Sequence, residues 1–456
     1  MKVYLETMGC QMNVLDSELV ESLLLAEGIE LTDQPGNADV LLYNTCSVRR
    51  HAEDKVHSRL GWACQRKAAG RKITIGVLGC MAQRLGEKLL RRHSGLDIVC
   101  GPGQLGRLVE LIRAATAGGE AKIASDPPRT SARDDDDNLD ALDLARRPAR
   151  THLPAQAYVR IMRGCDNFCS YCVVPYVRGR ERSRPADNIV EEVRRLVGAG
   201  TTAVTLLGQT VNSYCATDAG ARTGLADLLV RLDGVAGLRR VRFVTNYPGR
   251  FDQAILQAMR DLPSVCEYLH VPAQSGSQRV LAAMNRKYSR AEYDELVDRA
   301  REVVPGVGIA SDFIVGFPGE TPVDQAASIE LIRRSRFKNC YIFKYSPRPG
   351  TAAQRRLNDD VPADVKSRRH RELLDAQAQV SLADNQALVG RRVEVLVEGP
   401  SPRQRKRPAG GDGSQLTGRT RSDHIVVFDG PASLAGQYVD VEIAAATALT
   451  LIGQLG

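Results

Sequence analysis

The feature that most constrains the fold of this chain is a strand-like run followed by a helix-like run, repeated six times between Tyr158 and Phe343. The strand-like runs are short and apolar, as buried parallel strands are. They are predicted at residues 158–161, 203–207, 241–244, 268–271, 309–314 and 340–343. Because right-handed crossovers join parallel strands, six such units curl into an open barrel with its chemistry at the strand carboxyl ends. We therefore expect a central partial (βα)6 barrel over residues 151–386.

The first hundred or so residues alternate in the same way and predict an open parallel α/β sheet over residues 1–117. Its strands are expected at residues 3–5, 40–43, 73–78 and 96–99, with helices at 16–26, 52–67, 85–92 and 105–115. Residues 118–150 are polar and charged and include an acidic run at 134–137. A segment with so little to bury is predicted to be a solvated linker.

The last part of the chain changes to short β-like runs. A charged helix is expected at 361–387, followed by strands at 393–397, 415–419, 425–428, 438–441 and 447–452. Five strands of this length predict a small all-β barrel over residues 387–456. The basic turn at 403–407 either meets phosphates or is a solvated loop.

Three cysteines follow the first barrel strand in a C-x3-C-x2-C run: Cys165, Cys169 and Cys172. Three thiolates can hold three irons of a 4Fe-4S cluster, which leaves the fourth iron free to bind another ligand. The alternatives are a zinc site, although no fourth ligand follows closely, and buried thiols, although the loop is polar. The spacing, with Tyr171 before the third cysteine, is similar to that of radical S-adenosylmethionine (SAM) enzymes.

Three further cysteines, Cys10, Cys46 and Cys80, each come just after a predicted strand of the first sheet and before a helix. Ligands bind at this carboxyl edge in open α/β sheets, so these thiols can gather into a second trio. Ordinary buried thiols are the competing interpretation, and Cys100 also follows a strand. Spacing alone does not decide between the two.

Other candidate residues also lie at strand ends. Gly208, Gln209 and Gly316 close the second and fifth barrel strands, where backbone can approach a cofactor closely or simply turn. Ser275 lies in the segment 274–277 after the fourth strand, which could donate hydrogen bonds to or accept them from ribose hydroxyls, although helix N-capping explains Ser277 equally well. Basic residues that could contact RNA phosphates, with internal ion pairing as the alternative, are Arg178, Arg180, Arg182, Arg184 and Arg419.

Composition limits the class of protein. The net charge of +8 permits a nucleic-acid partner, and eleven cysteines are too few for a disulfide scaffold in a chain of 456 residues. No apolar run approaches the roughly 18 residues of a membrane span, and the chain opens into a strand rather than a signal peptide. We expect a cytoplasmic globular enzyme that does not bind membranes.

Several motifs together resemble the radical SAM methylthiotransferases. These are Gly9-Cys10-Gln11-Met12-Asn13, Asn44-Thr45-Cys46-Ser47-Val48-Arg49, Gly79-Cys80-Met81-Ala82-Gln83-Arg84 and the run from Cys172 to Pro185. The C-terminal barrel is similar to the TRAM domain, an RNA-binding module. The resemblance implies that all six cysteines bind 4Fe-4S clusters, and it assigns Cys100 to the core. The chain departs from the family pattern at Thr210, Asn246 and Tyr247, which bears on substrate preference.

The activity that the resemblance implies is methylthiolation of an N6-isopentenyladenosine beside the anticodon of tRNA, with two SAM molecules and two clusters. The cluster on Cys165, Cys169 and Cys172 would cleave SAM to a 5'-deoxyadenosyl radical, because adenine C2 has no acidic proton or leaving group. The second cluster would supply sulfur. Expected partners are tRNA, an electron donor and a cluster-repair or sulfur-donor protein, with the chain itself a monomer.

Two alternatives stay open at this point. One is the same chemistry on another target, such as N6-threonylcarbamoyladenosine in tRNA or an aspartate of a ribosomal protein. The other is a non-enzymatic iron-sulfur electron carrier or RNA-binding protein.

Overall fold

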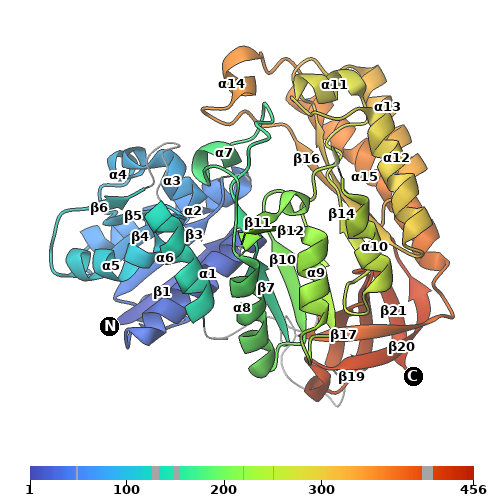
Figure 1. Ribbon diagram of the computed structural model, residues 1–456. Coiled ribbons are helices and arrows are strands. Elements are labelled where there is room, and N and C mark those ends of the chain that lie inside the picture. Colours follow the sequence, from blue (N-terminus) through green and yellow to red (C-terminus); the bar gives the residue numbers. More distant parts are fainter. Residues whose placement is uncertain (48–49, 126–132, 147–154, 219, 250, 403–413) are drawn as a thin grey trace.

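The chain folds into an N-terminal sheet, a central barrel and a C-terminal barrel (Figure 1). The computed structural model describes residues 1–47, 50–125, 133–146, 155–218, 220–249, 251–402 and 414–456. The basic turn at 403–407 therefore lies outside the described residues. No helix in the described part of the chain is both long enough and apolar enough to span a membrane.

The N-terminal sheet has six parallel strands in the order β2-β1-β3-β4-β5-β6. Their bounds are β1 Lys2–Met8, β2 Glu30–Leu31, β3 Val40–Thr45, β4 Thr74–Gly79, β5 Ile98–Cys100 and β6 Lys122–Ala124. The helices are α1 Gln11–Ala26, α2 Arg50–Ala68, α3 Cys80–Leu85, α4 Glu87–Arg92 and α5 Leu108–Thr116. Every residue of β3 and β4 is buried, because α1 and α5 cover one face of the sheet and α2, α3 and α4 cover the other. The predicted open α/β sheet is confirmed.

The segment expected to be a solvated linker contains a helix, α6 Arg133–Ala145. One side of its second half packs against the neighbouring domains, with Leu139 at 2% exposure and Asp143 at 0%. Asp143 pairs with Arg160 of the barrel domain at 2.7 Å. The prediction of a solvated spacer is wrong for this part, because Leu139 and Leu142 pack in the core of the N-terminal domain and charged side chains of the helix pair with other elements.

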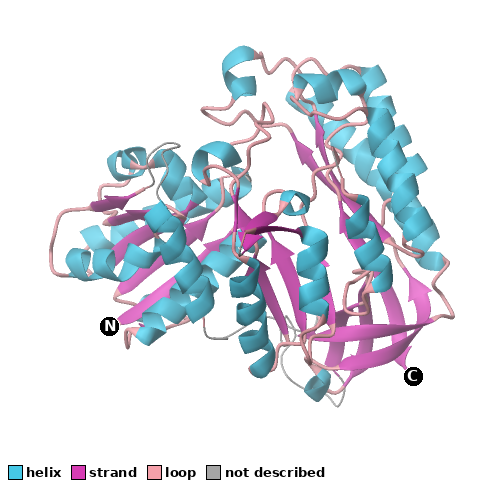
Figure 2. Cartoon of the chain, in the orientation of Figure 1, coloured by secondary structure: helices cyan, strands magenta, loops and turns pink. Residues whose placement is uncertain are grey.

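The central domain has six parallel strands in two three-stranded sheets, β13-β10-β7 and β14-β15-β16. They are β7 Gln156–Arg160, β10 Ala203–Leu207, β13 Arg240–Phe243, β14 Tyr268–His270, β15 Gly308–Val315 and β16 Asn339–Lys344. A parallel bridge between Val241 and Val265 joins the two halves beside β14. Helices cover the outer face of the curved sheet (Figure 2): α8 Ala186–Gly198, α9 Leu225–Asp233, α10 Gln253–Asp261, α12 Arg290–Val303, α13 Pro322–Ser335 and α15 Ala363–Gln386. The predicted partial barrel is confirmed.

Shorter elements decorate this barrel. The helices are α7 Val174–Val177, α11 Gln278–Ala283 and α14 Ala352–Arg356. Two antiparallel pairs that the periodicity did not predict are β8 Met162–Arg163 with β9 Arg182–Ser183, and β11 Cys215–Asp218 with β12 Ala221–Gly224. In Figure 1, α7 lies between the N-terminal sheet and the barrel.

The C-terminal domain is a closed five-stranded barrel in the order β17-β18-β19-β21-β20. Its strands are β17 Arg392–Pro400, β18 Ser414–Arg419, β19 Ile425–Gly430, β20 Tyr438–Ala446 and β21 Thr450–Leu455. It packs against the amino-terminal ends of the central strands, where buried Arg240 donates to the carbonyl oxygen of Arg419 at 2.7 Å and pairs with Glu394 at 2.9 Å. The N-terminal domain and the cysteine loop lie toward the other ends of those strands, the carboxyl ends.

Candidate functional site

Three adjacent strands of the N-terminal sheet end at one level, and each carries a cysteine just beyond its end. In the register of the sheet Met8 pairs with Thr45, and Thr45 pairs with Gly79. Cys10, Cys46 and Cys80 follow these residues directly or after one residue. The parallel register therefore gathers thiols that lie 36 and 34 residues apart in sequence.

Two buried asparagines tie these three loops together. Asn13 donates from Nδ2 to Asn44 Oδ1 at 3.1 Å, and Asn44 donates from Nδ2 to the Asn13 carbonyl oxygen at 2.9 Å. Asn13 Oδ1 also accepts from the backbone N–H of Cys10 at 3.2 Å. A Cβ at Gly79 would lie 2.5 Å from Asn44 Oδ1, so the third loop needs glycine to reach this pair. The asparagines of the two N-terminal motifs thus position the thiols, a role that the sequence did not reveal.

The thiols of this trio differ in acidity. A hydrogen bond with Cys46 and then the nearby charge of Arg178 lower the pKa of Cys10 to about 6, against the opposing effect of burial. Burial raises the pKa of Cys80. Because metals bind thiolates, a metal that enters this site must displace a proton from Cys80.

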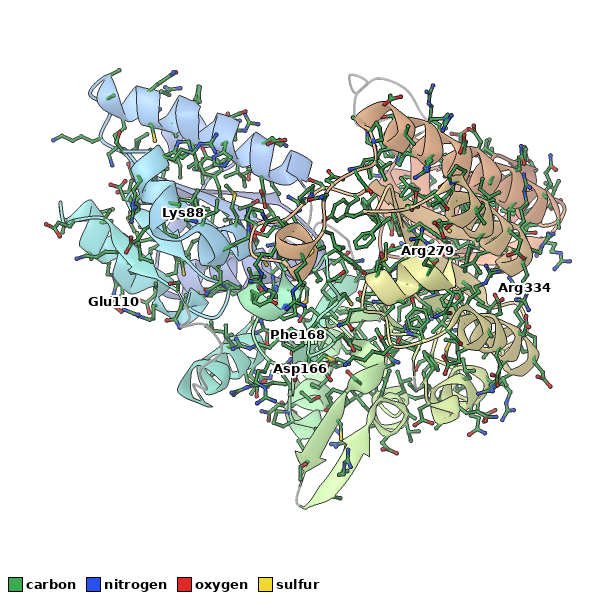
Figure 3. The ribbon with its side chains drawn as sticks, turned by 90° about the horizontal axis from the view of Figure 1, so that it is seen from above. Lys88, Glu110, Asp166, Phe168, Arg279 and Arg334 are labelled. Atoms are coloured by element: carbon green, nitrogen blue, oxygen red, sulfur yellow. The ribbon has the colours of Figure 1, made fainter. Side chains whose placement is uncertain are left out.

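The loop of Cys165, Cys169 and Cys172 lies centrally between the N-terminal domain and α11. Figure 3 shows Asp166 and Phe168 of this loop there, with Arg279 of α11 on the opposite side from the N-terminal domain. The end of α11 holds the loop, because Ser170 Oγ donates to the Ala283 carbonyl oxygen at 2.9 Å and Asn285 Nδ2 to that of Phe168 at 2.8 Å.

Burial disfavours the thiolate form of two cysteines in the loop. Burial raises the pKa of Cys165, and it raises that of Cys172 to about 12. Among the described residues no three His, Cys, Asp or Glu side chains are grouped closely enough to hold a single metal ion. Thiolates are the ligands of 4Fe-4S clusters, and three of them leave one iron open to another ligand, so the donor set of each trio fits such a cluster.

A cavity of about 580 Å³ fills the interior of the barrel. Cys10 and Cys46 line it from the N-terminal domain, and Arg419 and Asp423 line it from the C-terminal barrel. Its walls are side chains of the barrel strands, namely Tyr158, Thr205, Arg242, Tyr268, His270, Asp312, Tyr341 and Phe343. The second trio thus opens into the barrel through two of its thiols, and all three domains contribute to one cavity.

The residues predicted to contact SAM have different surroundings. Gln209 Oε1 is buried and has no hydrogen-bond partner within the described part of the chain, as expected of a group that awaits a ligand. The Tyr171 ring packs edge-on against Phe317 with a centroid distance of 6.5 Å. Ser275 Oγ instead accepts from the backbone N–H of Ser277 at 3.1 Å.

The two glycines of this set are explained by packing. A Cβ at Gly208 would lie 2.5 Å from Met162 Cγ, and one at Gly316, which has φ of +69°, would lie 2.3 Å from Lys366 Cγ. Neither glycine needs a cofactor to account for it.

The row of arginines after the cysteine loop does not form the stripe that the alternation predicted. Arg178 is buried and donates to Asp16 Oδ2 at 2.7 Å, and Arg184 is buried and pairs with Glu192 at 2.7 Å. The prediction of phosphate contacts is wrong for these two, and internal ion pairing holds instead. Gly179, with φ of +76°, breaks the extended chain that the alternation assumed.

The other predicted RNA contacts differ in exposure. The side chain of Arg180 is 68% exposed and lies 3.9 Å from Asp166, and Arg182 is half-buried on β9. Arg419 pairs with Asp423 at 3.0 Å and with Glu398 at 3.5 Å.

Two of the three departures from the family pattern lie near the cysteine loop. Thr210 Oγ1 is 3.4 Å from Cys165 Sγ and accepts from Asn167 Nδ2 at 3.3 Å. Tyr247 OH accepts from the backbone N–H of Lys287 at 2.7 Å. The Oδ1 of buried Asn246 has no hydrogen-bond partner among the described residues. Thr210 thus touches the loop, Tyr247 contacts Lys287 and Arg286, and Asn246 donates to the His270 carbonyl oxygen at 3.0 Å.

Family models match all three parts of the chain. Residues 2–101 match the Uncharacterized protein family UPF0004, residues 159–332 match the Radical SAM superfamily, and residues 386–455 match the TRAM domain. Together with the partial barrel and its cysteine loop, these matches define a radical SAM enzyme.

Full-length relatives identify the family of radical SAM enzymes to which the chain belongs. The chain is 48% identical to a tRNA-2-methylthio-N(6)-dimethylallyladenosine synthase of Rhodopirellula baltica, over 99% of this chain and 95% of the relative. It is 42% identical to the synthase of the same name from Moorella thermoacetica, over 98% of this chain and 97% of the relative. The chain belongs to the family of tRNA-2-methylthio-N(6)-dimethylallyladenosine synthases, a family of radical SAM methylthiotransferases.

Solved structures share the fold at low identity. The radical SAM methyltransferase TsrM of Kitasatospora setae, with cobalamin and a [4Fe-4S] cluster bound, aligns with a TM-score of 0.57 at 14% identity. The alignment covers 77% of this chain and 74% of that one.

Proposed function

We propose that this protein converts N6-isopentenyladenosine beside the anticodon of tRNA into its 2-methylthio derivative. The names of the full-length relatives support the substrate and the product. The observation that carries the proposal is that Cys10 and Cys46 line the cavity inside the radical SAM barrel. A second sulfur-bearing site therefore opens into the place where a bound substrate would react.

In this proposal each trio of thiols holds one 4Fe-4S cluster. Cys165, Cys169 and Cys172 would hold the cluster that binds SAM, and Cys10, Cys46 and Cys80 would hold the other. When bound, the first cluster and SAM supply radical chemistry that can functionalise adenine C2, which has neither an acidic proton nor a leaving group. The chain's own residues bind, orient and shelter the reactants from water.

The cavity walls are suited to a base. Tyr268, Tyr341 and Phe343 line one side and offer aromatic faces on which an unstacked adenine can lie. The unpartnered Gln209 Oε1 is available to accept a hydrogen bond from SAM. Tyr171, Gly208, Ser275 and Gly316 stay predictions as SAM contacts.

Further partners follow from the reaction. It consumes electrons and sulfur, so we propose transient contact with an electron donor and with a sulfur-donor or cluster-repair protein. Exposed Arg180, with Arg182 and Arg419, remain the proposed RNA contacts. We also propose a cytoplasmic monomer, with domain limits at residues 117, 150 and 386.

The test is an anaerobic assay of the full chain, reconstituted with iron and sulfide and supplied with SAM and a reductant. Three tRNA preparations are compared, in which the target adenosine carries isopentenyl, threonylcarbamoyl or no N6 group. We expect mass spectrometry of the RNA to find the methylthio group on the isopentenyl substrate. Methylthiolation of the threonylcarbamoyl substrate alone would contradict the proposed target, and the absence of 5'-deoxyadenosine would contradict the reaction.

A further inference from the structure

Each trio of thiols has an arginine that donates directly to one of its sulfurs. Arg178 donates from Nε to Cys80 Sγ at 3.3 Å, and Arg286 donates from Nη1 to Cys169 Sγ at 3.3 Å. Both sites thus contain a hydrogen bond from an arginine to a cysteine sulfur, although the two trios lie in different domains. The inference below rests on the proposed function, because it concerns the clusters that these trios would bind.

Arg178 belongs to the barrel domain but serves the N-terminal trio. It lies six residues after Cys172 in sequence, directly after α7. Its guanidinium also donates from Nη2 to Asp16 of α1 at 2.7 Å, and the side chain of Asp16 is 1% exposed. Val173 and Val177 pack against Cys80 and exclude water from the contact. The position of this charge is therefore fixed from two sides.

Arg286 is held at the other trio by groups that carry no negative charge. Its Nε donates to Tyr288 OH and its Nη2 donates to the Pro272 carbonyl oxygen, both at 3.1 Å. The rings of Tyr247 and Tyr288 lie 4.6 and 4.9 Å from its guanidinium carbon. A guanidinium enclosed by neutral partners is costly unless an anion is near. Here the group in position to supply the negative charge is the Cys169 sulfur.

We propose that Arg178 and Arg286 are positioning residues, each of which orients one cysteine of its trio and raises the reduction potential of the cluster bound there. Hydrogen bonds to cluster sulfurs and nearby positive charge stabilise the reduced state, which carries one more negative charge. A buried carboxylate has the opposite effect. Arg178 and Asp16 therefore act in opposite directions on the same cluster.

The test measures the potential of each cluster separately by redox titration with electron paramagnetic resonance. The full chain is used, with Cys165, Cys169 and Cys172 changed to alanine to isolate the N-terminal cluster, or with Cys10, Cys46 and Cys80 changed to isolate the other. In the first background we expect Arg178→Gln to shift the potential to more negative values and Asp16→Asn to shift it to more positive values. In the second we expect Arg286→Gln to shift the potential to more negative values.

Matched controls come from neighbouring exposed cations. Arg180→Gln changes a 68% exposed side chain two residues from Arg178, and Lys287→Gln changes an exposed residue next to Arg286. Both should leave the potentials unchanged. Iron content and melting temperature of every variant show whether the cluster and the fold are retained.

The outcomes separate the inference from the proposed function. Unchanged reduction potentials in Arg178→Gln and Arg286→Gln would overturn the inference. Shifts of the same sign in Arg178→Gln and Asp16→Asn would also overturn it. Loss of iron from Arg178→Gln with retention in Arg178→Lys would support the positioning role, and equal loss in both would overturn it. If the unmodified chain binds no cluster or forms no methylthio product, the proposed function itself fails.

Discussion

Replacement of Asp143 by alanine tests whether α6 is a structural clamp rather than a spacer. The Asp143 carboxylate is fully buried and lies among guanidinium groups of the barrel domain. Arg160 donates to it from Nε at 3.0 Å and from Nη2 at 2.7 Å, and Arg184 Nε lies 3.5 Å away. The substitution would leave these buried cations with one carboxylate fewer.

The expected loss follows from the surroundings of these groups. Removing one partner of a buried ion pair costs about 3–5 kcal/mol. We expect the lower end, because Arg160 keeps Asp16 at 3.7 Å and Arg184 keeps Glu192 at 2.7 Å. For a domain of this size about 3 kcal/mol corresponds to a decrease in melting temperature of roughly 6–12 °C.

The assay is differential scanning calorimetry of the cluster-free chain, with Glu87→Ala as the matched control. Glu87 and Arg91 form an ion pair whose side chains are 69% and 77% exposed, so its loss should change the melting temperature by about 1 °C. A change in Asp143→Ala no larger than in this control would refute the assignment of α6 as a buried clamp.

Three further predictions concern the cysteine loop, RNA binding and the C-terminal barrel. Gly164→Ala should abolish iron binding by the loop, because a Cβ there would lie 1.9 Å from the Arg180 carbonyl oxygen. Gly28→Ala is the control, because Gly28 also has a positive φ but open space around it, and iron analysis of this variant should find the iron content unchanged. Arg180→Ala should reduce the slope of log affinity for tRNA against log salt by about one unit, and an unchanged slope in filter binding would remove this residue from the RNA interface. Burial and then the charge of Lys338 lower the pKa of His424 from 6.5 to about 4. As the pH falls, the imidazole is therefore protonated in the unfolded chain before it is protonated in the folded one, so folding stability is lost between pH 6.5 and 4. His424→Gln should reduce that loss by at most about 3 kcal/mol, measured by denaturant unfolding at both pH values, and an equal loss in both proteins would contradict the buried neutral imidazole.

The sequence predicted the backbone that presents the thiols because parallel strands obey a simple rule. Their carboxyl ends meet at one edge, so cysteines that follow β1, β3 and β4 must come together whatever their separation in sequence. Cys100, which the strand pattern placed beyond its strand, is instead the last residue of β5, and its side chain is fully buried in the core, as the family resemblance implied. The strand pattern alone could not distinguish these cases, because both faces of a parallel sheet are apolar.

The sequence did not predict where buried charges go. The alternation of basic residues from Arg178 to Arg184 suggested one exposed row, yet Arg178 and Arg184 are buried against carboxylates from elsewhere in the chain, namely Asp16 and Asp140. Asp16 is 162 residues from Arg178, and no local pattern encodes that pairing. The packing of α6 was not predicted for the same reason, since its ion pairs and its leucines have partners on other elements.

The most direct measurement of the central claim compares the full chain with the variant in which Cys10, Cys46 and Cys80 are all alanine. Both are reconstituted anaerobically and supplied with SAM, a reductant and tRNA that carries isopentenyladenosine. The account predicts that the variant loses about half of its iron, still forms 5'-deoxyadenosine and makes no methylthio product. Methylthiolated tRNA at the level of the unmodified chain, with unchanged iron content, would contradict a second cluster on these three thiols.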